Sequence, residues 1–468
     1  MKKFIVIVLF VAGAAFVFAG LNVDAPYELS LQGYGGLIVP AASLLVIALL
    51  LWQGAWRGTS GKLMILLWCL PVLSTLYTQA AFQLTRHRVR TIEANEARLL
   101  GQHFIIGYSS FAEVAALAEK GLIAGIYITR HNVAGQTAET VKAEISALQA
   151  RRAAAGLPPL IVAADQEGGI VSHLSPPLKA PPALASFADL PSDIRNQSAE
   201  YVGRAQGQEL SALGVNLNFA PVLDLRLEGD HKFDFNTLID KRAISDVPDK
   251  VAQVGLAYVR GLNTSGVRAT LKHFPGLGRV ATDTHHFAAK LDAPLAELEQ
   301  ADWRPFREVL AGSNAAIMVA HVTLTEVDPD RPASHSKAVI DGIIRRRWNY
   351  QGIVITDDLV MGAVYTHLCT AVVEALNASA DLLLVAYGGS QFYRAFACAS
   401  DAFHRRELDT ATLRDSEVRL KRAFWAGPSD RADHETATVA RPAGDRASGV
   451  NGTAKSDLST SLAPVEFD

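Results

Sequence analysis

A carboxylate and an imidazole stand two residues apart in a stretch of the chain that is shaped by glycine and proline. Asp283 and His285 follow residues 272–278 (KHFPGLG), where two glycines and a proline favour a long loop over a helix. On such a loop Asp283 can accept a proton from the imidazole of His285, orient the ring and raise its pKa, as a general acid–base near neutral pH requires. A second carboxylate, Asp357, follows another apolar run. A carboxylate nucleophile with a separate acid–base group is the equipment of retaining glycoside hydrolysis.

Polar side chains also gather at the ends of four further apolar runs. Together with Asp357, the five groups are Asp165 to Glu167, Asp224, Lys272 with His273, His321, and Asp357 with Asp358. A single group of this kind is explained as a helix cap or as a polar residue closing a layer. Five together indicate a functional cleft, although for Asp358 itself we favour the helix-cap interpretation.

Eight short, mostly apolar runs alternate with helical patterns between residues 98 and 425. The runs are Phe104–Tyr108, Gly125–Thr129, Leu160–Ala164, Val215–Pro221, Ala269–His273, Ala315–His321, Gly352–Thr356 and Asp381–Ala386. The helical patterns include Ser110–Lys120, Thr137–Ala153, Asp249–Asn263 and Leu295–Leu310. Such runs are typical of a buried parallel sheet, and eight repeats predict an α/β fold of the TIM (β/α)8 barrel type. The alternative, a doubly wound open sheet, loses support because no G-x-G-x-x-G follows any run.

The first 84 residues differ from the rest in composition. They carry six charged side chains, whereas 19% of the whole chain is Asp, Glu, Lys or Arg. Three apolar runs, Phe4–Leu21, Leu37–Trp52 and Leu63–Phe82, are each near the length that spans a bilayer. We therefore expect a membrane region with about three transmembrane helices over residues 1–84, followed by the barrel over residues 85–426. The spans hold no ionisable group except at their ends, so we expect them to anchor rather than to transport.

The charges that flank these runs predict an orientation. Lys2 and Lys3 precede the first run, and Arg57 and Lys62 follow the second. The positive-inside rule then places the N-terminus in the cytoplasm and the barrel outside. In a bacterium this corresponds to the inner membrane with the catalytic domain on the periplasmic side.

Two features leave alternatives open. Arg86, Arg88 and Arg90 follow the third run on its expected outer side, against the same rule. If one run does not span, the barrel faces the cytoplasm. The first run is alternatively a signal peptide with a poor cleavage site, residues 17–19, and its removal would still leave the barrel outside.

The remaining composition bounds partners and cofactors. Residues 427–468 are rich in small and polar types without periodicity, which predicts a disordered tail. Three cysteines exclude a disulfide-dense scaffold and a four-cysteine zinc site, and we interpret Cys369 and Cys398 as free buried thiols rather than as a pair. A net charge of −3 without a long basic run argues against nucleic acid. We expect no cofactor and no metal.

Five motifs in order resemble glycoside hydrolase family 3, and within it the single-domain β-N-acetylglucosaminidases of the NagZ type. In chain order they are DQEGG (165–169), NFAPVLD (218–224), KRAI (241–244), KHFPGLG with DTH (272–278 and 283–285) and ITDDLVMGA (355–363). The resemblance covers about residues 98–425. It implies that Asp357 is the nucleophile and that His285 is the acid–base, supported by Asp283.

The same resemblance implies a sugar-binding subsite. Asp165 matches a carboxylate that binds sugar hydroxyls, Lys272 and His273 match two further hydroxyl ligands, and Arg242 matches an arginine that lines the subsite. His173 stands where the family has a pocket arginine, so a titratable ring replaces a permanent charge.

Other departures surround an intact catalytic trio. Ile170 replaces the first arginine of the family's R-V-x-R, and Leu277 replaces the second histidine of its K-H-F-P-G-H-G. Drift around a working site explains both changes, and a different aminosugar or aglycone is the alternative. These departures therefore bear on substrate identity rather than on reaction type.

The resemblance implies a retaining exo-β-N-acetylglucosaminidase that forms a covalent glycosyl-enzyme on Asp357. We expect a glycan substrate derived from peptidoglycan. One rival function is a β-N-acetylglucosaminide phosphorylase, and another is a non-catalytic, membrane-tethered module that binds cell-wall glycan. A third is a metal-dependent barrel hydrolase that uses His273, His285, His286, His321 and Asp357 as ligands.

Overall fold

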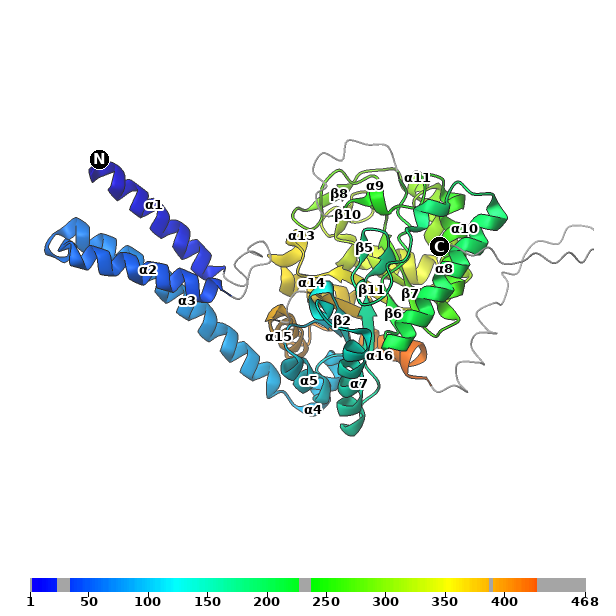
Figure 1. Cartoon of the computed structure of the whole chain (residues 1–468), viewed down its shortest axis with the longest axis horizontal. Helices are drawn as coiled ribbons and strands as arrows, with labels where there is room; N and C mark the ends of the chain where they lie inside the picture. The colour runs from blue at the N-terminus through cyan, green and yellow to red at the C-terminus, as the bar shows by residue number, and fades with distance from the viewer. Residues whose placement is uncertain (1, 23–33, 227–236, 387–389, 427–468) are drawn as a thin grey trace, which may run out of the picture. The chain divides into compact units, whose positions relative to one another are not determined.

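The computed structural model describes residues 2–22, 34–226, 237–386 and 390–426, and its centre is a closed barrel of eight parallel strands (Figure 1). The strands pair in the order β1-β12-β11-β9-β7-β6-β3-β2, and β2 returns to β1. They are β1 (Phe104–Gly107), β2 (Gly125–Ile128), β3 (Ile161–Ala164), β6 (Leu217–Asn218), β7 (Arg268–Phe274), β9 (Ala316–Val319), β11 (Val354–Asp358) and β12 (Leu382–Val385). The predicted TIM barrel is confirmed, since each predicted run contains one of these strands or overlaps it.

Helices connect successive strands and cover the outside of the barrel. They are α4 (Ala94–Gly101), α5 (Phe111–Glu119), α6 (Arg130–Val133), α7 (Ala138–Ala154), α8 (Ser192–Leu213), α9 (Ile239–Arg242), α10 (Pro248–Asn263), α11 (Leu295–Gln300), α12 (Arg304–Ala311), α13 (Gly362–Tyr365), α14 (Leu368–Asn377), α15 (Ser390–His404) and α16 (Thr410–Leu420), with π-helical turns at Ala338–Arg347 and Lys421–Trp425. Short 3-10 turns lie at Leu184–Phe187 and Ala333–His335. Ser110, Thr137 and Asp409 cap α5, α7 and α16 by accepting backbone N–H bonds, which satisfies donors left free at a helix start.

One helix expected from the sequence is broken. The predicted helix Leu295–Leu310 is divided into α11 and α12 by Ala301, Asp302 and Trp303. Pro305 lies in the first turn of α12, where its missing N–H costs nothing, so it favours a new helix start. The Trp303 ring turns into the core and donates from Nε1 to the carbonyl of Pro275, 3.0 Å away.

Two apolar cores hold the barrel together. Side chains from alternate positions of the strands fill its interior, and Tyr127, Phe219 and Met318 belong to this inner core. The C-terminal turn Lys421–Trp425 packs against the same core, and Trp425 donates from its indole to the carbonyl of Pro159 at 2.9 Å. A second, larger core lies between the outer faces of the strands and the helices. Because the interior is filled, only the loops at the strand ends are free to form a site.

Short strands beside the barrel shape these loops. β4 (Gln166–Gly168) and β5 (Val171–Ser172) form an antiparallel hairpin after β3, while β8 (Ala289–Leu291) pairs in parallel with β10 (Val322–Leu324). The hairpin turns at Gly168, whose φ of 102° favours glycine, and a Cβ there would lie 2.3 Å from the carbonyl oxygen of Pro182.

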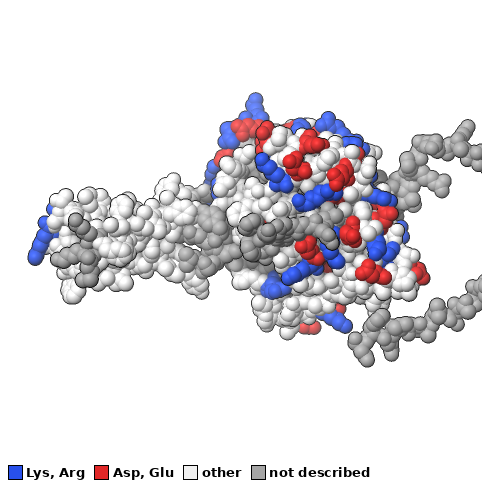
Figure 2. Space-filling view, turned by 90° about the horizontal axis from the view of Figure 1, so that it is seen from above, with Lys and Arg blue, Asp and Glu red and all other residues white. Residues whose placement is uncertain are grey.

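The three N-terminal helices are long and apolar enough to cross a membrane. They are α1 (Lys2–Leu21), α2 (Gly35–Trp52) and α3 (Thr59–Arg90), with a short 3-10 turn at Ala55–Arg57 between the last two. Their surface carries few charged side chains, whereas the barrel surface mixes both signs (Figure 2). The expected spans are thus found as helices, but α3 extends eight residues past Phe82 and continues as a polar helix.

The polar end of α3 is bound to the barrel. Arg86 lies 3.0 Å from the carboxylate of Glu113 on α5, and Arg88 pairs with Asp401 on α15. Phe82 packs edge-on against Tyr393 of α15, with ring centroids 5.9 Å apart. Two of the three arginines that opposed the expected orientation therefore have acidic partners within the barrel.

The α1 helix packs on α3 through small residues. Gly13 and Gly20 are buried, and a Cβ at Gly20 would lie 2.3 Å from the hydroxyl of Ser74. The Thr78 hydroxyl donates to the Gly20 carbonyl at 3.0 Å. Small residues that allow two backbones to approach closely are typical of packed membrane helices.

The expectation of free thiols at Cys369 and Cys398 is wrong. The two residues form a disulfide that joins α14 to α15, with their Cα atoms 5.1 Å apart. The sequence interpretation failed because the two cysteines are 29 residues apart along the chain and become neighbours only in the fold. The predicted tail at 427–468 and residues 23–33, between the first two apolar runs, lie outside the described residues.

A buried ion network secures the amino-terminal end of β12. Asp381 is fully buried and accepts hydrogen bonds from Arg345 at 2.5 Å and from Arg419 and Ser416 at 2.8 Å each. Burial alone would raise the pKa of Asp381, but the two guanidinium groups outweigh it and lower the pKa.

We predict that Asp381→Asn destabilises the barrel by about 3–5 kcal/mol, because two buried arginines lose their counter-charge. Urea unfolding of the detergent-solubilised chain, followed by tryptophan fluorescence, measures the change. The matched control is Asp401→Asn, which removes the half-exposed partner of Arg88 and is expected to cost less than about 1 kcal/mol. Equal losses in the two variants would contradict the assigned role of Asp381.

Candidate active site

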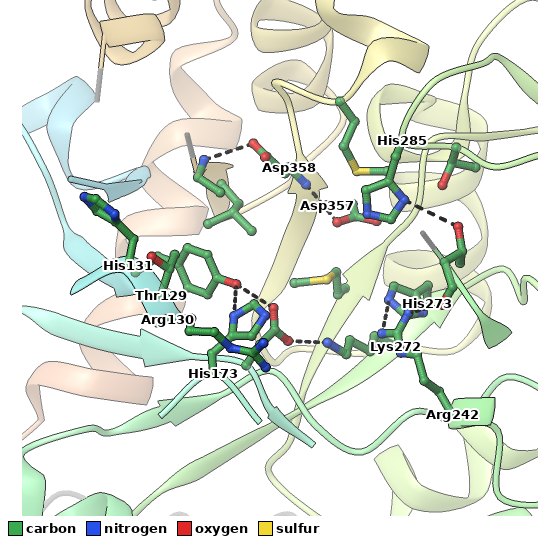
Figure 3. Close-up of a pocket in the computed structure, with 18 of the residues that line it drawn as sticks. Thr129, Arg130, His131, His173, Arg242, Lys272, His273, His285, Asp357 and Asp358 are labelled. Atoms are coloured by element: carbon green, nitrogen blue, oxygen red, sulfur yellow. Dashed lines mark hydrogen bonds and ion pairs between the residues drawn. The ribbon is translucent and has the colours of Figure 1, made fainter. Parts of the chain in front are cut away.

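A cavity of about 770 Å³ opens where the carboxyl ends of the barrel strands converge (Figure 3). Seven of the eight residues proposed from the sequence line it: Asp165, His173, Arg242, Lys272, His273, His285 and Asp357. The eighth, Asp283, is fully buried directly behind His285. These residues come from the ends of β3, β7 and β11 and from the loops between them, so the barrel topology brings the predicted residues together.

Asp283 fixes both the position and the tautomer of His285. One oxygen of its carboxylate lies 2.9 Å from the backbone nitrogen of His285 and 2.9 Å from the ring Nδ1. Thr237 donates to the same oxygen at 3.0 Å. The carboxylate can only accept, so Nδ1 carries the proton and the opposite ring nitrogen, Nε2, is left for the cavity.

The pKa of His285 is raised above its ordinary value. Burial disfavours the charged ring, but the hydrogen bond to Asp283 and the negative charges of Asp357 and Asp283 outweigh burial. The ring is therefore protonated over a wider pH range than a free histidine, as a proton donor near neutral pH requires.

Asp357 lies at the end of β11 and faces the same cavity. Burial would raise its pKa, but His273, His321 and His285, together with the N–H of Asp358, lower it below the ordinary value. The N–H of Asp358 donates to Asp357 Oδ1 at 2.8 Å and leaves the second oxygen available. An ionised carboxylate beside a protonated imidazole is the charge state that nucleophilic attack with acid assistance needs.

Asp358 has structural contacts. Its Oδ1 accepts the N–H of Val360 at 3.1 Å and the N–H of Ala386 at 2.9 Å, so it closes the turn after β11 and joins it to the end of β12. Burial raises its pKa to about 7. These contacts agree with a capping role rather than with a second nucleophile.

A histidine below this turn holds its backbone. His321 donates from Nε2 to the carbonyl of Asp358 at 2.8 Å, since a carbonyl oxygen can only accept. Its Nδ1 therefore accepts from the hydroxyl of Ser334, 2.7 Å away. Both ring nitrogens of His321 are engaged, which leaves neither as a ligand for the metal considered above. Within the described residues, no group of three or more His, Cys, Asp or Glu is arranged to hold a metal ion.

Four buried or partly buried charges alternate across the floor of the cavity. Lys272 pairs with Asp165 and lies 2.6 Å from Glu167. Arg242 holds Glu167 with two bonds, 2.9 Å from Nε and 2.6 Å from Nη2. Burial alone would neutralise these groups, but each is flanked by opposite charge, so the pKa values of Asp165 and Glu167 are lowered and that of Lys272 is raised.

Asp224 lies six residues beyond the end of β6, not at the strand end as predicted, and it organises the next part of the wall. One oxygen lies 2.7 Å from Nδ1 of His273, and the other accepts the N–H of Leu277 at 2.7 Å. Nε2 of His273 faces Arg242 at 3.3 Å. Leu277 is buried and lines the cavity, so the leucine replaces a polar wall with an apolar one.

The β4–β5 hairpin returns His173 to the side of Asp165. The N–H of His173 donates to the Asp165 carbonyl at 2.9 Å, and Nδ1 of the ring lies 3.1 Å from the hydroxyl of Tyr127. Ile170 is at the tip of the hairpin and half-exposed, outside the cavity lining. Of the three departures noted in the sequence, only His173 and Leu277 therefore alter the cavity.

Several residues of the site escaped the sequence analysis. Tyr127 lies within a predicted strand, Glu167 belongs to one of the polar groups without an individual role, and Thr237 is distant from Asp283 in sequence. Arg130 and His131, which line the cavity beyond His173, belong to α6, the short helix after β2. The one available signal was Tyr127, a hydroxyl-bearing residue near the end of an otherwise aliphatic strand.

Comparisons with known proteins agree with this geometry. Residues 91–423 match the glycosyl hydrolase family 3 N-terminal domain. A β-hexosaminidase of Xanthomonas axonopodis pv. citri is 35% identical over 296 residues, which are 62% of this chain and 83% of that protein. A β-hexosaminidase of Pseudomonas aeruginosa is 35% identical over 230 residues, 49% of this chain and 66% of that protein.

Solved structures give the same result. A family 3 β-N-acetylglucosaminidase from Paenibacillus sp. str. FPU-7 superposes with a TM-score of 0.65 at 30% identity, covering 75% of this chain and 64% of that one. LpqI from M. tuberculosis superposes with a TM-score of 0.63 at 27% identity, covering 71% and 94%.

We predict that Asp283→Asn lowers the pKa of His285, because the ring loses a charged hydrogen-bond acceptor while its burial is unchanged. NMR titration of the His285 ring in the full chain measures the pKa. Asp189→Asn, which changes a carboxylate exposed at the surface, is the control, and we expect it to leave the pKa of His285 unchanged. An unchanged pKa in Asp283→Asn would show that the dyad does not set the protonation of His285.

Proposed function

The chain belongs to glycosyl hydrolase family 3 and is a glycoside hydrolase of the NagZ-type β-hexosaminidases, and from this premise we propose that it is a retaining exo-β-N-acetylglucosaminidase with Asp357 as nucleophile and His285 as acid–base. The observation that carries the proposal is the shared cavity, which the Asp357 carboxylate and the Asp283–His285 dyad both face. The relatives' printed names supply the sugar class, and the site residues supply the mechanism.

In the first step, a free oxygen of Asp357 attacks the anomeric carbon of a terminal β-linked N-acetylglucosamine. His285 gives its Nε2 proton to the glycosidic oxygen as the bond to the aglycone breaks, so the leaving group departs as a neutral alcohol. The product is a covalent glycosyl ester on Asp357 with inverted configuration. The raised pKa of His285 and the lowered pKa of Asp357 support this division of roles.

In the second step, neutral His285 takes a proton from water, and the water oxygen attacks the anomeric carbon. The ester bond to Asp357 breaks, the carboxylate is regenerated and the ring returns to its protonated form. Two inversions give net retention. The hydrogen bond to Asp283 keeps Nε2 directed at the cavity in both protonation states, so one ring serves as acid and then as base.

The sugar-binding roles are assigned to the floor and wall of the cavity. We assign the hydroxyl-binding positions to Asp165, Lys272, His273 and Arg242, whose polar atoms are fixed by one another before any sugar enters. His173 completes this wall. Because these polar groups need not reorganise when the sugar binds, they favour one fixed orientation of the sugar in the cavity.

The natural substrate is proposed to be a peptidoglycan fragment. A cavity of about 770 Å³ lies within the range that takes a ligand larger than one sugar. His285 is a cation before proton transfer and neutral after it, so it never repels an anionic aglycone as a second carboxylate would. Arg130 and His131 add basic groups on the side of the cavity beyond His173.

We also propose a membrane region over residues 1–84, with the barrel over residues 85–426 outside the inner membrane of a bacterium. The Cys369–Cys398 disulfide supports this side, because disulfides persist in oxidising compartments and are rare in the cytosol. Arg86 and Arg88 form ion pairs with acidic residues of the barrel, so their positive charges do not argue for a cytoplasmic position under the positive-inside rule. The packing of Gly13 and Gly20 favours α1 as a retained helix over a removed signal peptide.

We predict that the detergent-solubilised chain releases nitrophenol from an aryl β-N-acetylglucosaminide and that Asp357→Ala lowers kcat/KM at least a thousandfold, because the covalent step is lost. With azide present, Asp357→Ala forms the α-glycosyl azide, because the small anion enters the space of the missing carboxylate. Asp189→Ala is the control and keeps the wild-type rate.

Three outcomes would redirect the proposal. Release that depends on phosphate and yields sugar 1-phosphate would make the enzyme a phosphorylase. Unchanged activity in Asp357→Ala would place the nucleophile elsewhere. No release by a folded wild-type chain, with phosphate and other aryl glycosides tried, would favour a glycan-binding module.

We predict that Cys369 and Cys398 are oxidised in the protein as it stands in the cell. Intact cells are treated with an alkylating reagent that enters the cytoplasm, and the two peptides are then analysed by mass spectrometry with and without reduction. A linked peptide pair supports the periplasmic side. Two alkylated cysteines before reduction would place the barrel in the cytoplasm.

A further inference from the structure

One hydroxyl group connects the sugar-binding carboxylate to the histidine that replaces the family's arginine. Tyr127, on β2, places its hydroxyl oxygen 2.7 Å from Asp165 Oδ2 and 3.1 Å from Nδ1 of His173. The Tyr127 ring is fixed in the inner core, where it stacks on Phe219 with centroids 5.5 Å apart. The hydroxyl therefore has a set place between the two groups.

Counting protons assigns a direction to each of these bonds. Asp165 is ionised, because its partners hold its pKa low, so it can only accept. Burial and the charge of Asp165 raise the pKa of Tyr127, so the phenol keeps its single proton and gives it to Asp165. The phenol oxygen then has only lone pairs to offer His173, and Nδ1 of His173 must carry the proton of that bond.

The second nitrogen of the His173 ring is thereby left as an acceptor. Burial lowers the pKa of this ring, and Lys272 and Arg130 act in the same direction, against the opposing charges of Asp165 and Glu167. A neutral ring with its proton on Nδ1 has a bare lone pair on Nε2. His173 lines the cavity, and within the described residues Nε2 has no hydrogen-bond partner and is not sealed from solvent.

We propose that His173 determines specificity in the sugar subsite by accepting a hydrogen bond at Nε2 from a donor group of the sugar, with Tyr127 as the positioning residue that fixes the tautomer. This inference rests on the proposed function for the identity of the ligand as an N-acetylhexosamine. The assignment of the His173 tautomer is independent of the proposed function, because it follows from the hydrogen bonds of Tyr127.

The consequence is an inversion of polarity at one point of the subsite. An arginine side chain can only donate hydrogen bonds, so it can bind any sugar oxygen that offers a lone pair. A bare Nε2 can only accept, so the sugar must present a hydroxyl or amide proton there. An analogue that carries fluorine in place of that hydroxyl loses its donor and leaves the ring nitrogen facing another lone pair.

The tautomer is tested without reference to activity. The full chain is labelled with 15N in the histidine rings, and long-range 1H–15N spectra at neutral pH report which ring nitrogen is protonated. The resonances of His173 are assigned by their disappearance in His173→Gln. We expect the proton on Nδ1 in the wild type and a shift toward Nε2 in Tyr127→Phe, where the acceptor is removed. A wild-type ring protonated on Nε2 alone, or on both nitrogens, would overturn the proposal.

The polarity is tested with donor-deleted sugars. Values of kcat/KM are measured for 4-nitrophenyl N-acetyl-β-D-glucosaminide and for its 3-, 4- and 6-deoxyfluoro analogues. We expect at least one analogue to be at least tenfold worse in the wild type. His173→Gln keeps that penalty, because its amide oxygen accepts, whereas His173→Arg lowers the rate on the parent sugar and reduces the penalty at least fivefold.

Penalties that are the same within twofold in all three proteins would overturn the acceptor role. Tyr127→Phe adds an independent measure. Without the hydroxyl that fixes the His173 tautomer, we expect KM to rise more than kcat falls. An equal loss of kcat with KM unchanged would make Tyr127 only structural. If the wild type hydrolyses none of the sugars, the proposed function fails, and the ring spectra still decide the tautomer.

Discussion

The buried ammonium of Lys272 is the constraint on which the site depends. It lies between the carboxylates of Asp165 and Glu167, and Arg242 holds Glu167 from the other side. Removing such ions from water costs several kcal/mol each, and only close opposite charges offset that cost. The barrel must therefore bring β3, β7 and α9 into one arrangement, because a displaced partner would leave a bare charge in the interior.

That ion network also fixes the protons around it. Asp165 stays ionised, so Tyr127 donates its proton to that carboxylate. The Tyr127 oxygen can then only accept, so Nδ1 of His173 donates to it. On the opposite side Asp283 determines which nitrogen of His285 is protonated, and the Asp358 carbonyl does so for His321. Each histidine ring thus has one nitrogen held by a partner that can only accept a hydrogen bond, and this partner decides which nitrogen carries the proton. A site of this kind stabilises a developing charge without reorganising its dipoles during the reaction.

The three apolar N-terminal helices and the barrel are joined by a continuous structural element. The apolar part of α3 leads without interruption into a polar turn that binds α5 and α15 through Arg86 and Arg88. A helical connection transmits orientation, whereas a flexible linker does not. The same α15 carries Cys398, so the disulfide to α14 and the contacts of α3 secure one side of the barrel.

The sequence by itself determined the barrel, because each strand lies in or overlaps a short apolar run, and polar groups stand at the ends of five of these eight runs. It also indicated the Asp283–His285 pair, which is close in the chain on its own loop, and the family resemblance pointed to the other residues that we propose as nucleophile and sugar ligands. What only the tertiary structure decided are contacts between distant segments: Tyr127 with His173, Glu167 with Arg242, and Cys369 with Cys398. Local pattern reports which face of an element is buried, but barrel closure decides which buried groups meet. The direction of a hydrogen bond at Tyr127 follows from its two partners together, and neither is its neighbour in the chain.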